Sequence, residues 1–462
     1  CNHGCKIFLT HYNRIMRTFY GREKEIEALH RIHNLSKDNA QMTVITGRRR
    51  IGKTTLVAKA CEGYTMLYFF IGRKSEALLC EEFAEEVRMR LGCDIGSFNS
   101  FPRLLSVIMD KARERHIILV LDEFQNFKFV NEAIFSDMQN LWDRHKAEAH
   151  IHLILCGSVQ TMMAKIFDDR REPLYGRANN RIAVTPFTTS TLMEILRDHN
   201  ASFTPDDLLT LFMTTGGVAK YVEEMMTHNA TDKESMLREF FSVSSYFIPE
   251  GKDMLSDEFG REGVNYFTIL SAIADGHNER GGIKSHTDIE PGGFLDRLEK
   301  DYCLITRQRP YGASEKGQNV HYAITDMFLN FWFRFVHKYR SAIEMGNMDY
   351  VIGKVMADYD TYSGRILEMY FRRRFRETGI YNLVTNYWER NGGNEIDLIA
   401  VSDTERELVI GEIKCNPNRI SLPQLEAKAH SIIAAHRKFK VRFIALSLDD
   451  MTTQQPATLY VK

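Results

Sequence analysis

The sequence predicts an α/β protein whose amino-terminal part is a doubly wound parallel sheet. Short apolar segments of strand length recur along this part, and helical patterns separate them, as in sheets whose parallel strands are joined by crossover helices. The segment 117–121 is apolar at every position, which a parallel strand covered on both faces requires. With 462 residues, of which 44% are hydrophobic and 26% charged, the chain can form about three domains with real cores.

A glycine-containing turn connects the first predicted strand to a helix within residues 41–55. Its spacing, Gly47-x-x-x-x-Gly52-Lys53-Thr54, is that of a phosphate-binding P-loop. The glycines let the backbone N–H groups converge on a phosphate, and the following helix directs its positive end at the same charge. The Thr54 hydroxyl is placed to ligate Mg²⁺. The predicted nucleotide-binding residues are Gly47, Arg50, Ile51, Gly52, Lys53, Thr54 and Thr55.

Two carboxylates, Asp122 and Glu123, follow the apolar strand at the sheet edge where ligands bind in such folds. We expect Asp122 to hold Mg²⁺ through water and Glu123 to orient or deprotonate the attacking water. The alternative for Glu123 is a solvated loop carboxylate. Ser158 ends the next strand, 151–156, where its hydroxyl can sense the γ-phosphate, position water or simply terminate the strand.

An arginine cluster lies next to the last predicted strand of this sheet, 181–184. Arg177 and Arg181 are candidates for an arginine finger, which offsets the negative charge of a phosphoryl-transfer transition state. A solvated basic loop accounts equally well for either residue. If one of them acts across a subunit boundary, the protein is a homo-oligomer.

Four domains are predicted. The parallel-sheet domain covers 16–187. It is followed by a helical lid (188–250), a winged helix (260–340) and a final module (355–462). Within the first domain, an extra strand at 66–71 lies, in chain order, between the strand before Lys53 and the strand before Asp122.

The winged helix is predicted from helices at 264–274 and 294–302, a polar Gly-rich turn between them, and strands at 304–307 and 321–324. Its candidate recognition helix carries three acidic and two basic side chains and is therefore not basic, so protein interaction or dimerisation is at least as well supported as DNA recognition. The aromatic-rich segment 328–336 is expected to be helical core.

A second set of chemical groups lies near the C-terminus. Glu412 and Lys414 are two apart on a predicted strand and therefore share a face, and hairpin pairing can bring Asp397 beside Glu412. Asp397 and Glu412, together with the carbonyl of Ile413, would bind Mg²⁺. Lys414 would polarise water or stabilise a pentavalent phosphate.

Glu368, on a helix predicted to open at Gly364, is a further candidate metal ligand. The same helix continues into the most basic run of the chain, 372–376, which is either a surface that follows a phosphate backbone or a solvated helix face. The alternative for the carboxylates and the lysine is a surface hairpin with an ordinary salt bridge. The apolar strand around Glu412 argues against that alternative.

These motifs together resemble the archaeal-type P-loop ATPases, an additional-strand group near the AAA+ and signal-transduction NTPases. The resemblance is carried by Phe19-Tyr20-Gly21-Arg22-Glu23, the P-loop, Leu121-Asp122-Glu123-Phe124, Cys156-Gly157-Ser158, Pro173 to Arg177 and Gly216-Gly217-Val218. It implies ATP and Mg²⁺ as cofactors. The family usually has proline where Ala219 stands, which weakens any sensing role for that lid loop.

Many members of that family carry a winged helix and a C-terminal domain similar to the PD-(D/E)xK nucleases. Asp397, Glu412 and Lys414 match the nuclease signature, and Glu368 matches its upstream helical acid. The resemblance therefore implies an α/β restriction-endonuclease-like fold at the C-terminus. Ile396 stands where the signature has proline, a common departure in this superfamily.

Composition limits the remaining choices. The net charge of −1 gives no global attraction to nucleic acid, so DNA contacts must come from local patches. No apolar run has the length of a membrane span, and no secretory signal is visible. The eight cysteines contain no Cys-x-x-Cys pair, so we expect reduced thiols in a cytoplasmic protein. Residues 1–15 fit no predicted element, and we expect them to be disordered.

Two functions follow from the sequence. The first is an ATP-hydrolysing protein that couples ATP to a Mg²⁺-dependent nuclease-like or DNA-binding domain. The second is an ATP-dependent assembly or regulatory switch whose C-terminal domain is a non-catalytic binding module. The Asp397, Glu412 and Lys414 set favours the first, whereas the neutral charge and the non-basic winged helix favour the second.

Overall fold

The computed structural model describes residues 18–259, 263–314, 317, 319–390 and 392–453. The chain divides into two compact units: the first comprises Gly21–Pro186, and the second comprises the chain from Phe187 onward together with the residues before Gly21. The prediction of disorder for residues 1–15 lies outside the described residues. In the part of the chain that is described, no helix is long and apolar enough to cross a membrane.

A five-stranded parallel sheet forms the centre of the first unit, as predicted, with the order β2-β3-β4-β1-β5. The strands are β1 (Gln41–Thr46), β2 (Met66–Phe70), β3 (Ile117–Asp122), β4 (Ile151–Gly157) and β5 (Asn180–Ala183). In space β4 separates β1 from β3, and the extra strand β2 lies at the edge. Because all five strands run in parallel, their carboxyl ends meet at one edge of the sheet.

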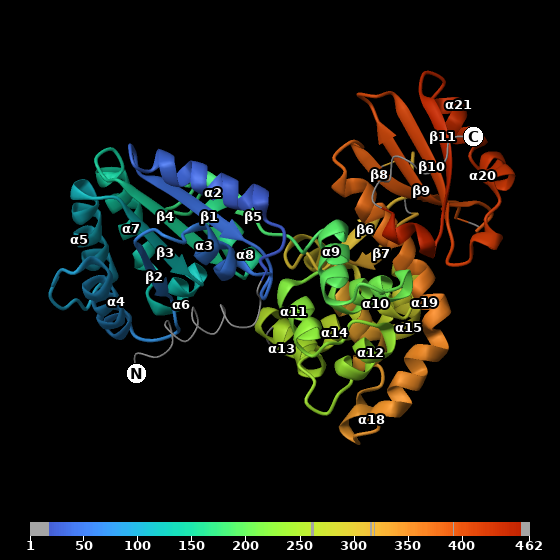
Figure 1. Ribbon diagram of the computed structural model, residues 1–462, viewed down its shortest axis with the longest axis horizontal. Helices are drawn as coiled ribbons and strands as arrows, with labels where there is room; N and C mark the ends of the chain where they lie inside the picture. The colour runs from blue at the N-terminus through green and yellow to red at the C-terminus, as the bar shows by residue number, and fades with distance from the viewer. Residues whose placement is uncertain (1–17, 260–262, 315–316, 318, 391, 454–462) are drawn as a thin grey trace. The chain divides into compact units, whose positions relative to one another are not determined.

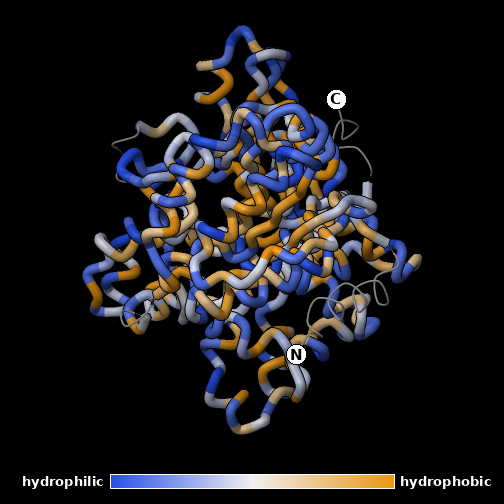
Figure 2. Tube along the Cα trace, turned by 90° about the vertical axis from the view of Figure 1, so that its left-hand side faces the viewer, coloured by the Kyte–Doolittle hydropathy of each residue, from blue (hydrophilic) through white to orange (hydrophobic). Residues whose placement is uncertain are grey.

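Helices flank this sheet (Figure 1), as crossover connections require. They are α2 (Glu23–Leu35), α3 (Lys53–Ala60), α4 (Glu76–Leu91), α5 (Phe101–Glu114), α6 (Phe127–Val130), α7 (Ala133–His145) and α8 (Gln160–Asp168), with a short 3₁₀ turn η1 (Phe124–Asn126). Strands β3 and β4 are buried at every position, which explains why their sequences are almost wholly apolar. Figure 2 shows the hydrophobic segments gathered toward the inside and hydrophilic segments at the peripheral turns.

The second unit begins with helices only, as predicted: α9 (Thr189–His199), α10 (Pro205–Thr215), α11 (Ala219–Thr227), α12 (Lys233–Phe240) and α13 (Phe247–Phe259). Helix α10 begins at Pro205 because Thr204 and Asp207 form a capping box. The aromatic-rich segment is buried helical core, as expected, in α17 (Met327–Phe331) and the π-helical η3 (Trp332–His337).

The predicted winged helix is formed by α14 (Gly263–Ala274), α15 (Arg280–Thr287), α16 (Gly292–Lys300) and the antiparallel pair β6 (Ile305–Gln308) and β7 (His321–Ile324). One expectation was wrong: residues 280–287 form helix α15 rather than part of a Gly-rich turn. Its two glycines are tolerated because Ile283 is fully buried and anchors the helix.

The hairpin of this winged helix packs on the C-terminal sheet domain. The Tyr311 N–H donates to the Asn386 carbonyl (3.0 Å), and the Tyr311 hydroxyl bonds the His436 ring (2.8 Å). The Trp388 indole N–H donates to Asn319 (3.0 Å). This packing lies within one chain, so the protein-interaction or dimerisation role predicted for the module stays a prediction.

The C-terminal domain is a four-stranded mixed sheet of order β11-β10-β9-β8. The strands are β8 (Leu383–Trp388), β9 (Glu395–Ser402), β10 (Glu407–Ile413) and β11 (Lys440–Leu446). The helices of this part are α19 (Met348–Glu377), α20 (Leu422–Lys428) and α21 (His430–Ala435), with 3₁₀ turns η4 (Pro417–Arg419) and η5 (Leu448–Thr452). Helix α18 (Arg340–Glu344) precedes α19 and packs on α19 and η3. Helix α19, orange in Figure 1, begins at Met348 and not at Gly364 as predicted. Asn347 caps it there by accepting from the Tyr350 N–H.

A cluster of buried histidines lies in the first unit, beside the amino ends of β3 and β4. The His33 ring is 4.5 Å from the His116 ring and 6.3 Å from the His152 ring. Among the described residues, neither ring nitrogen of His33 finds a hydrogen-bond partner. Burial, reinforced by the neighbouring histidines, lowers the pKa of His33 to about 4 and that of His152 to about 3. Both rings are therefore neutral in the folded protein at neutral pH.

We predict that mild acid destabilises the first unit through these histidines. Their folded pKa values lie below the unfolded value, so the stability they contribute is present above pH ~6.5 and is lost as the pH falls toward the folded values. Each ring should cost about 2 kcal/mol of unfolding free energy between pH 7 and pH 5. Urea unfolding at both pH values measures this loss.

His33→Leu should reduce the pH-dependent loss by about 2 kcal/mol. His430→Leu, at an exposed position of α21, is the matched control and should leave the loss unchanged. An equal loss in His33→Leu and in the wild type would contradict the prediction.

Candidate functional site

The P-loop lies at the carboxyl edge of the parallel sheet, between β1 and α3. Gly47 has φ 152° and Gly52 has φ 92°, in the region that favours glycine. A Cβ at Gly47 would lie 2.5 Å from the Val184 carbonyl oxygen, so no larger residue fits there. The loop is thus held close to the segment that follows β5, and its backbone is shaped for a phosphate group as predicted from the glycine spacing.

Lys53, the first residue of α3, lies folded over this loop. Its ammonium group donates to the carbonyl oxygens of Gly47 (2.9 Å) and Arg48 (3.1 Å), and only 6% of the residue is exposed. Burial lowers the pKa of Lys53, and the nearby carboxylates of Glu123 and Asp122 act in the opposite direction. A buried ammonium held only by carbonyls is prepared to bind a stronger anionic acceptor.

Asp122 and Thr54, the two residues predicted to hold Mg²⁺ at the P-loop, contact each other directly. The Thr54 hydroxyl donates to Asp122 Oδ2 at 2.8 Å, and the Asp122 side chain is buried. Tyr68, on the neighbouring strand β2, donates to the same oxygen at 2.6 Å. Sequence analysis missed Tyr68, since only the pairing of β2 with β3 brings it there.

Glu123 adopts a left-handed backbone conformation (φ 54°) directly after β3. Strain of this kind in a non-glycine residue is concentrated at functional sites. Its Oε2 accepts from the Ser158 hydroxyl (2.7 Å) and from the Gln125 amide (2.5 Å). The structure therefore brings Ser158 to Glu123, and Glu123 is not an isolated loop carboxylate. Gln125 was missed, although its place two residues after Glu123 was the available signal.

The two candidate finger arginines lie away from the P-loop of their own chain. Arg177 donates to Asp143 at the end of α7 (2.8 Å) and to the Pro173 carbonyl (2.7 Å). Two residues later the chain pairs with Met42 at the start of β1, so Arg177 lies toward the amino edge of the sheet.

Arg181 on β5 pairs in register with Val44 on β1. Its guanidinium donates to Asp168 and to the Phe167 carbonyl (2.9 Å) at the end of α8. Arg177 is thus held by the protein, whereas 47% of the Arg181 side chain on the edge strand β5 is exposed, so the solvated alternative stays open for Arg181. A finger role for either within one chain finds no support in this geometry.

A family of ATPase domains predominantly from Archaea matches residues 19–225 of the chain. These residues contain every P-loop and sheet-edge group described above. This part of the chain is an archaeal-type P-loop ATPase domain. A second family, described as archaeal and bacterial proteins of unknown function, matches residues 332–428. The P-loop motif and the parallel sheet therefore agree with an independent comparison, as the sequence resemblance predicted.

Similar proteins span most of this chain. An uncharacterized protein of Methanocaldococcus jannaschii, MJECL04, is 29% identical over 86% of this chain and 87% of its own length. The Walker-type ATPase PABY2304 of Pyrococcus abyssi covers 68% of this chain and 96% of its own, with 18% identity and a TM-score of 0.54. The ORC2 protein of Aeropyrum pernix, solved as ADPNP and ADP complexes, covers 72% and 96%, with 15% identity and a TM-score of 0.50. At these identities the solved structures support the fold.

The C-terminal carboxylates are brought together by pairing of β9 with β10. Leu398 pairs with Gly411, which places Asp397 next to Glu412. Asp397 Oδ2 accepts from the Ile413 N–H and from the Lys414 ammonium, both at 2.8 Å. Both strands lie inside a four-stranded sheet, so the surface-hairpin alternative is wrong. The Asp397–Lys414 ion pair that this alternative invoked is nevertheless present.

Glu368 faces the same region from α19. Burial raises the pKa of Glu368 to about 7, against the lowering effect of Arg372, whose guanidinium lies 3.2 Å away. Burial alone would lower the pKa of Lys414, but the hydrogen bond and charge of Asp397 outweigh it, so this pKa is raised. Lys414 is therefore a firmly held cation at neutral pH.

No group of three or more His, Cys, Asp or Glu side chains in the described ranges is arranged to hold a metal ion. The oxygen donors of Asp397 and Glu412 suit a hard cation. Lys414, however, already pairs with Asp397 Oδ2, and Glu412 accepts from the Ser421 N–H (3.2 Å). Asp397 Oδ2 is thus occupied by protein donors, and the metal role of Glu368, Asp397 and Glu412 stays a prediction.

Both interpretations of the basic run in α19 were wrong. Its arginines neither form a solvated face nor line a surface for phosphates, because Arg372 and Arg374 are buried. Instead they donate to backbone carbonyls of the protein: Arg372 to Asp397, Arg373 to Phe187 and Gly216, Arg374 to Asp450, Met451 and Thr453, and Arg376 to Val384. Only the folded chain supplies these acceptors.

We predict that Arg177→Ala acts on stability rather than on hydrolysis in a monomeric sample. Loss of the bonds to Asp143 and the Pro173 carbonyl should lower the free energy of unfolding by about 1–2 kcal/mol. The rate of ATP turnover per chain should stay within about twofold, which is the size of a 0.4 kcal/mol change in barrier. Urea unfolding and steady-state hydrolysis measure the two effects.

A strongly reduced rate at unchanged fold would show that Arg177 reaches a nucleotide bound by another subunit. In that case the specific activity of the wild type should rise with protein concentration. Mixing Arg177→Ala with Lys53→Ala should then restore part of the activity. The same test applies to Arg181→Ala.

Proposed function

We propose that this protein binds and hydrolyses ATP in its archaeal-type ATPase domain and that its C-terminal domain carries a nuclease-like site for DNA. We further propose that the protein is cytoplasmic. The observation that carries the first part is the convergence of Lys53, Thr54, Asp122 and Glu123 at the carboxyl edge of the sheet. Each group has the chemistry that phosphoryl transfer needs at that position.

On binding, Lys53 would exchange the carbonyls of Gly47 and Arg48 for phosphate oxygens, which are stronger acceptors for an ammonium group. Thr54 and Asp122 would hold Mg²⁺, since their hard oxygen donors already lie 2.8 Å apart. The bound ion supplies positive charge to the phosphate oxygens.

Glu123 would then activate the attacking water. Ser158 and Gln125 occupy its Oε2, which fixes the carboxylate and leaves Oε1 to accept the water proton. The water oxygen bonds to the γ-phosphorus, the bond to the β–γ bridging oxygen breaks, and ADP and inorganic phosphate result. Loss of either donor should therefore alter the position of the Glu123 carboxylate and with it the rate.

For the C-terminal domain, the nuclease-like proposal is supported by two carboxylates and one ammonium group that lie together at one end of β9 and β10. Asp397 and Glu412, with the Ile413 carbonyl, would hold Mg²⁺, and Lys414 would face the scissile phosphate. The second candidate, a non-catalytic binding module controlled by ATP, is supported by the Asp397–Lys414 ion pair, which fills the site without a metal.

We predict that Lys53→Ala abolishes ATP hydrolysis and weakens nucleotide binding. The substitution removes the ammonium group that is bound to the P-loop carbonyls and would bind the phosphates. Glu123→Gln should bind ATP normally and hydrolyse it about 10²–10⁴-fold more slowly, since the phosphate contacts remain and the proton acceptor is lost. Fluorescent-nucleotide binding and phosphate release measure the two steps. Hydrolysis by Glu123→Gln at the wild-type rate would exclude Glu123 as the base.

The C-terminal proposal is tested in a Lys53→Ala background, which limits metal binding at the P-loop. Mn²⁺ or Mg²⁺ should raise the unfolding temperature because the cation relieves repulsion between Asp397 and Glu412. Asp397→Ala should remove this shift, whereas Asp403→Ala, at an exposed turn after β9, should retain it.

In the protein with an intact P-loop, plasmid, linear and single-stranded DNA are incubated with metal, with and without ATP. Lys414→Ala should keep the metal shift and lose cleavage. No shift and no cleavage under any condition would favour the binding-module candidate.

A further inference from the structure

Two adjacent arginines of α19 bind two different parts of the second unit. Arg372 donates to the Asp397 carbonyl (2.7 Å) and pairs with Glu368, both at the C-terminal carboxylate site. Arg373 donates to the carbonyl oxygen of Gly216 in the lid (3.0 Å) and to that of Phe187, directly before the lid. Successive residues of a helix point about 100° apart, so neighbouring side chains can serve separate faces.

The lid segments that Arg373 binds are fixed to each other and to the end of α19. The Phe187 N–H donates to the Gly217 carbonyl (2.8 Å), and a Cβ at Gly217 would lie 2.8 Å from the Phe187 carbonyl oxygen. Glu377, which pairs with Arg373 (2.8 Å), also accepts from the Thr189 hydroxyl (2.6 Å). These segments must therefore shift together when either of them moves.

A short stretch of chain joins this cluster to the nucleotide site. Val184 lies against the P-loop: its N–H donates to the Thr46 carbonyl (2.8 Å), and its own carbonyl leaves no room for a Cβ at Gly47. Phe187 is three residues further on, and Pro186 restricts the backbone between them. Residues 185 and 186 are thus the connection between Val184, which lies against the P-loop, and the Phe187 carbonyl that Arg373 binds.

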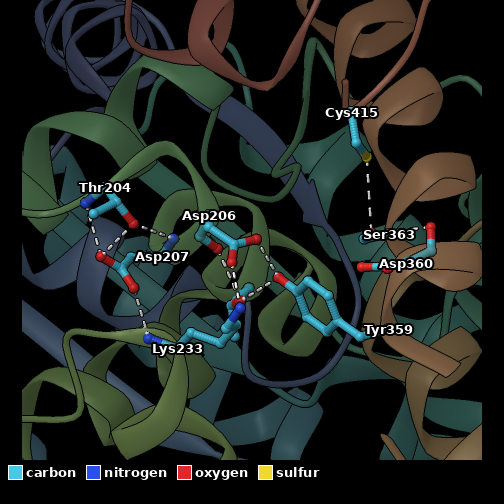
Figure 3. A network of polar contacts seen from close by, with 9 residues as sticks. Thr204, Asp206, Asp207, Lys233, Tyr359, Asp360, Ser363 and Cys415 are labelled. Carbon is cyan, nitrogen blue, oxygen red and sulfur yellow. Dashed lines mark hydrogen bonds and ion pairs between the residues drawn. The ribbon is translucent and has the colours of Figure 1, made fainter. Parts of the chain in front are cut away.

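A second contact between the lid and α19 lies near the middle of the helix (Figure 3). The Tyr359 hydroxyl donates to Asp206 (2.6 Å), which also binds Lys233 (2.5 Å). About one turn further along α19, the Ser363 hydroxyl contacts the Cys415 thiol (3.8 Å). Cys415 directly follows Lys414, so α19 touches the lid and the carboxylate site at two levels each.

We propose that α19 couples the nucleotide state of the ATPase domain to the geometry of the Asp397, Glu412 and Lys414 site. Arg373 responds to the position of the lid carbonyls, and Arg372 holds the backbone of Asp397. A helix of 30 residues moves as one body, so loss or gain of the Arg373 bonds is transmitted to Arg372. This coupling rests on the proposed binding of ATP and is independent of whether the C-terminal site cleaves DNA.

The thiol of Cys415 provides the test in the full-length protein. Its rate of alkylation by N-ethylmaleimide is followed by peptide mass spectrometry without nucleotide, with ADP and with a non-hydrolysable ATP analogue, at saturation. We expect the analogue to change the Cys415 rate by about fivefold or more, a typical size for coupled sites. The rate at the exposed Cys303 should stay constant.

Arg373→Ala should still bind the analogue and lose the Cys415 response, while Arg373→Lys should keep part of it because an ammonium can also donate to carbonyls. Arg238→Ala removes an exposed arginine of α12 and is the matched control, with a full response expected. A response in Arg373→Ala equal to that of the wild type would overturn the coupling. If the wild type binds the analogue and Cys415 does not respond, the coupling fails and the proposed ATP site stands; if it binds no nucleotide, both fail.

Discussion

The arrangement of the second unit depends on the pairing of α19 arginines with backbone carbonyls. Arg372, Arg373 and Arg374 donate to β9, to the lid and to the C-terminal turn η5 respectively. An unpaired buried carbonyl or guanidinium costs about 1–3 kcal/mol or more, so each bond excludes alternative positions of the helix. Loss of one arginine would leave one or more backbone carbonyls without this donor. Helix α19 is therefore the common support of the lid and of the C-terminal sheet.

The ATPase domain meets a different requirement, that of holding polar groups ready for a ligand that carries high negative charge. Its groups are satisfied by one another: Lys53 by carbonyls, and Asp122 by Thr54 and Tyr68. In the proposed function, these bonds would be exchanged for bonds to phosphate and Mg²⁺. Glu123 differs, because its strained backbone and two donors fix it relative to the sheet.

The winged-helix module contributes its hairpin to packing within the chain. Tyr311 and Trp388 bridge this hairpin and the C-terminal sheet domain through hydrogen bonds at both ends of the contact. A hairpin used in this way is not presented as the wing of a DNA-binding surface. This observation agrees with the balanced charge of helix α16, which has no excess of basic residues for phosphate contacts.

The sequence by itself determined the parts of the protein whose residues are contiguous. The P-loop is specified within residues 47–55, because the backbone freedom of a glycine is a local property. The parallel strands are specified by their own apolar composition, which a strand covered on both faces requires. The same locality made Asp122, Glu123 and Ser158 predictable at strand ends. Only the tertiary structure decided where Arg177 and the basic run of α19 point, since their acceptors lie far away in sequence. Charge alone does not reveal whether an arginine meets solvent, phosphate or a carbonyl, because that choice depends on packing between distant segments.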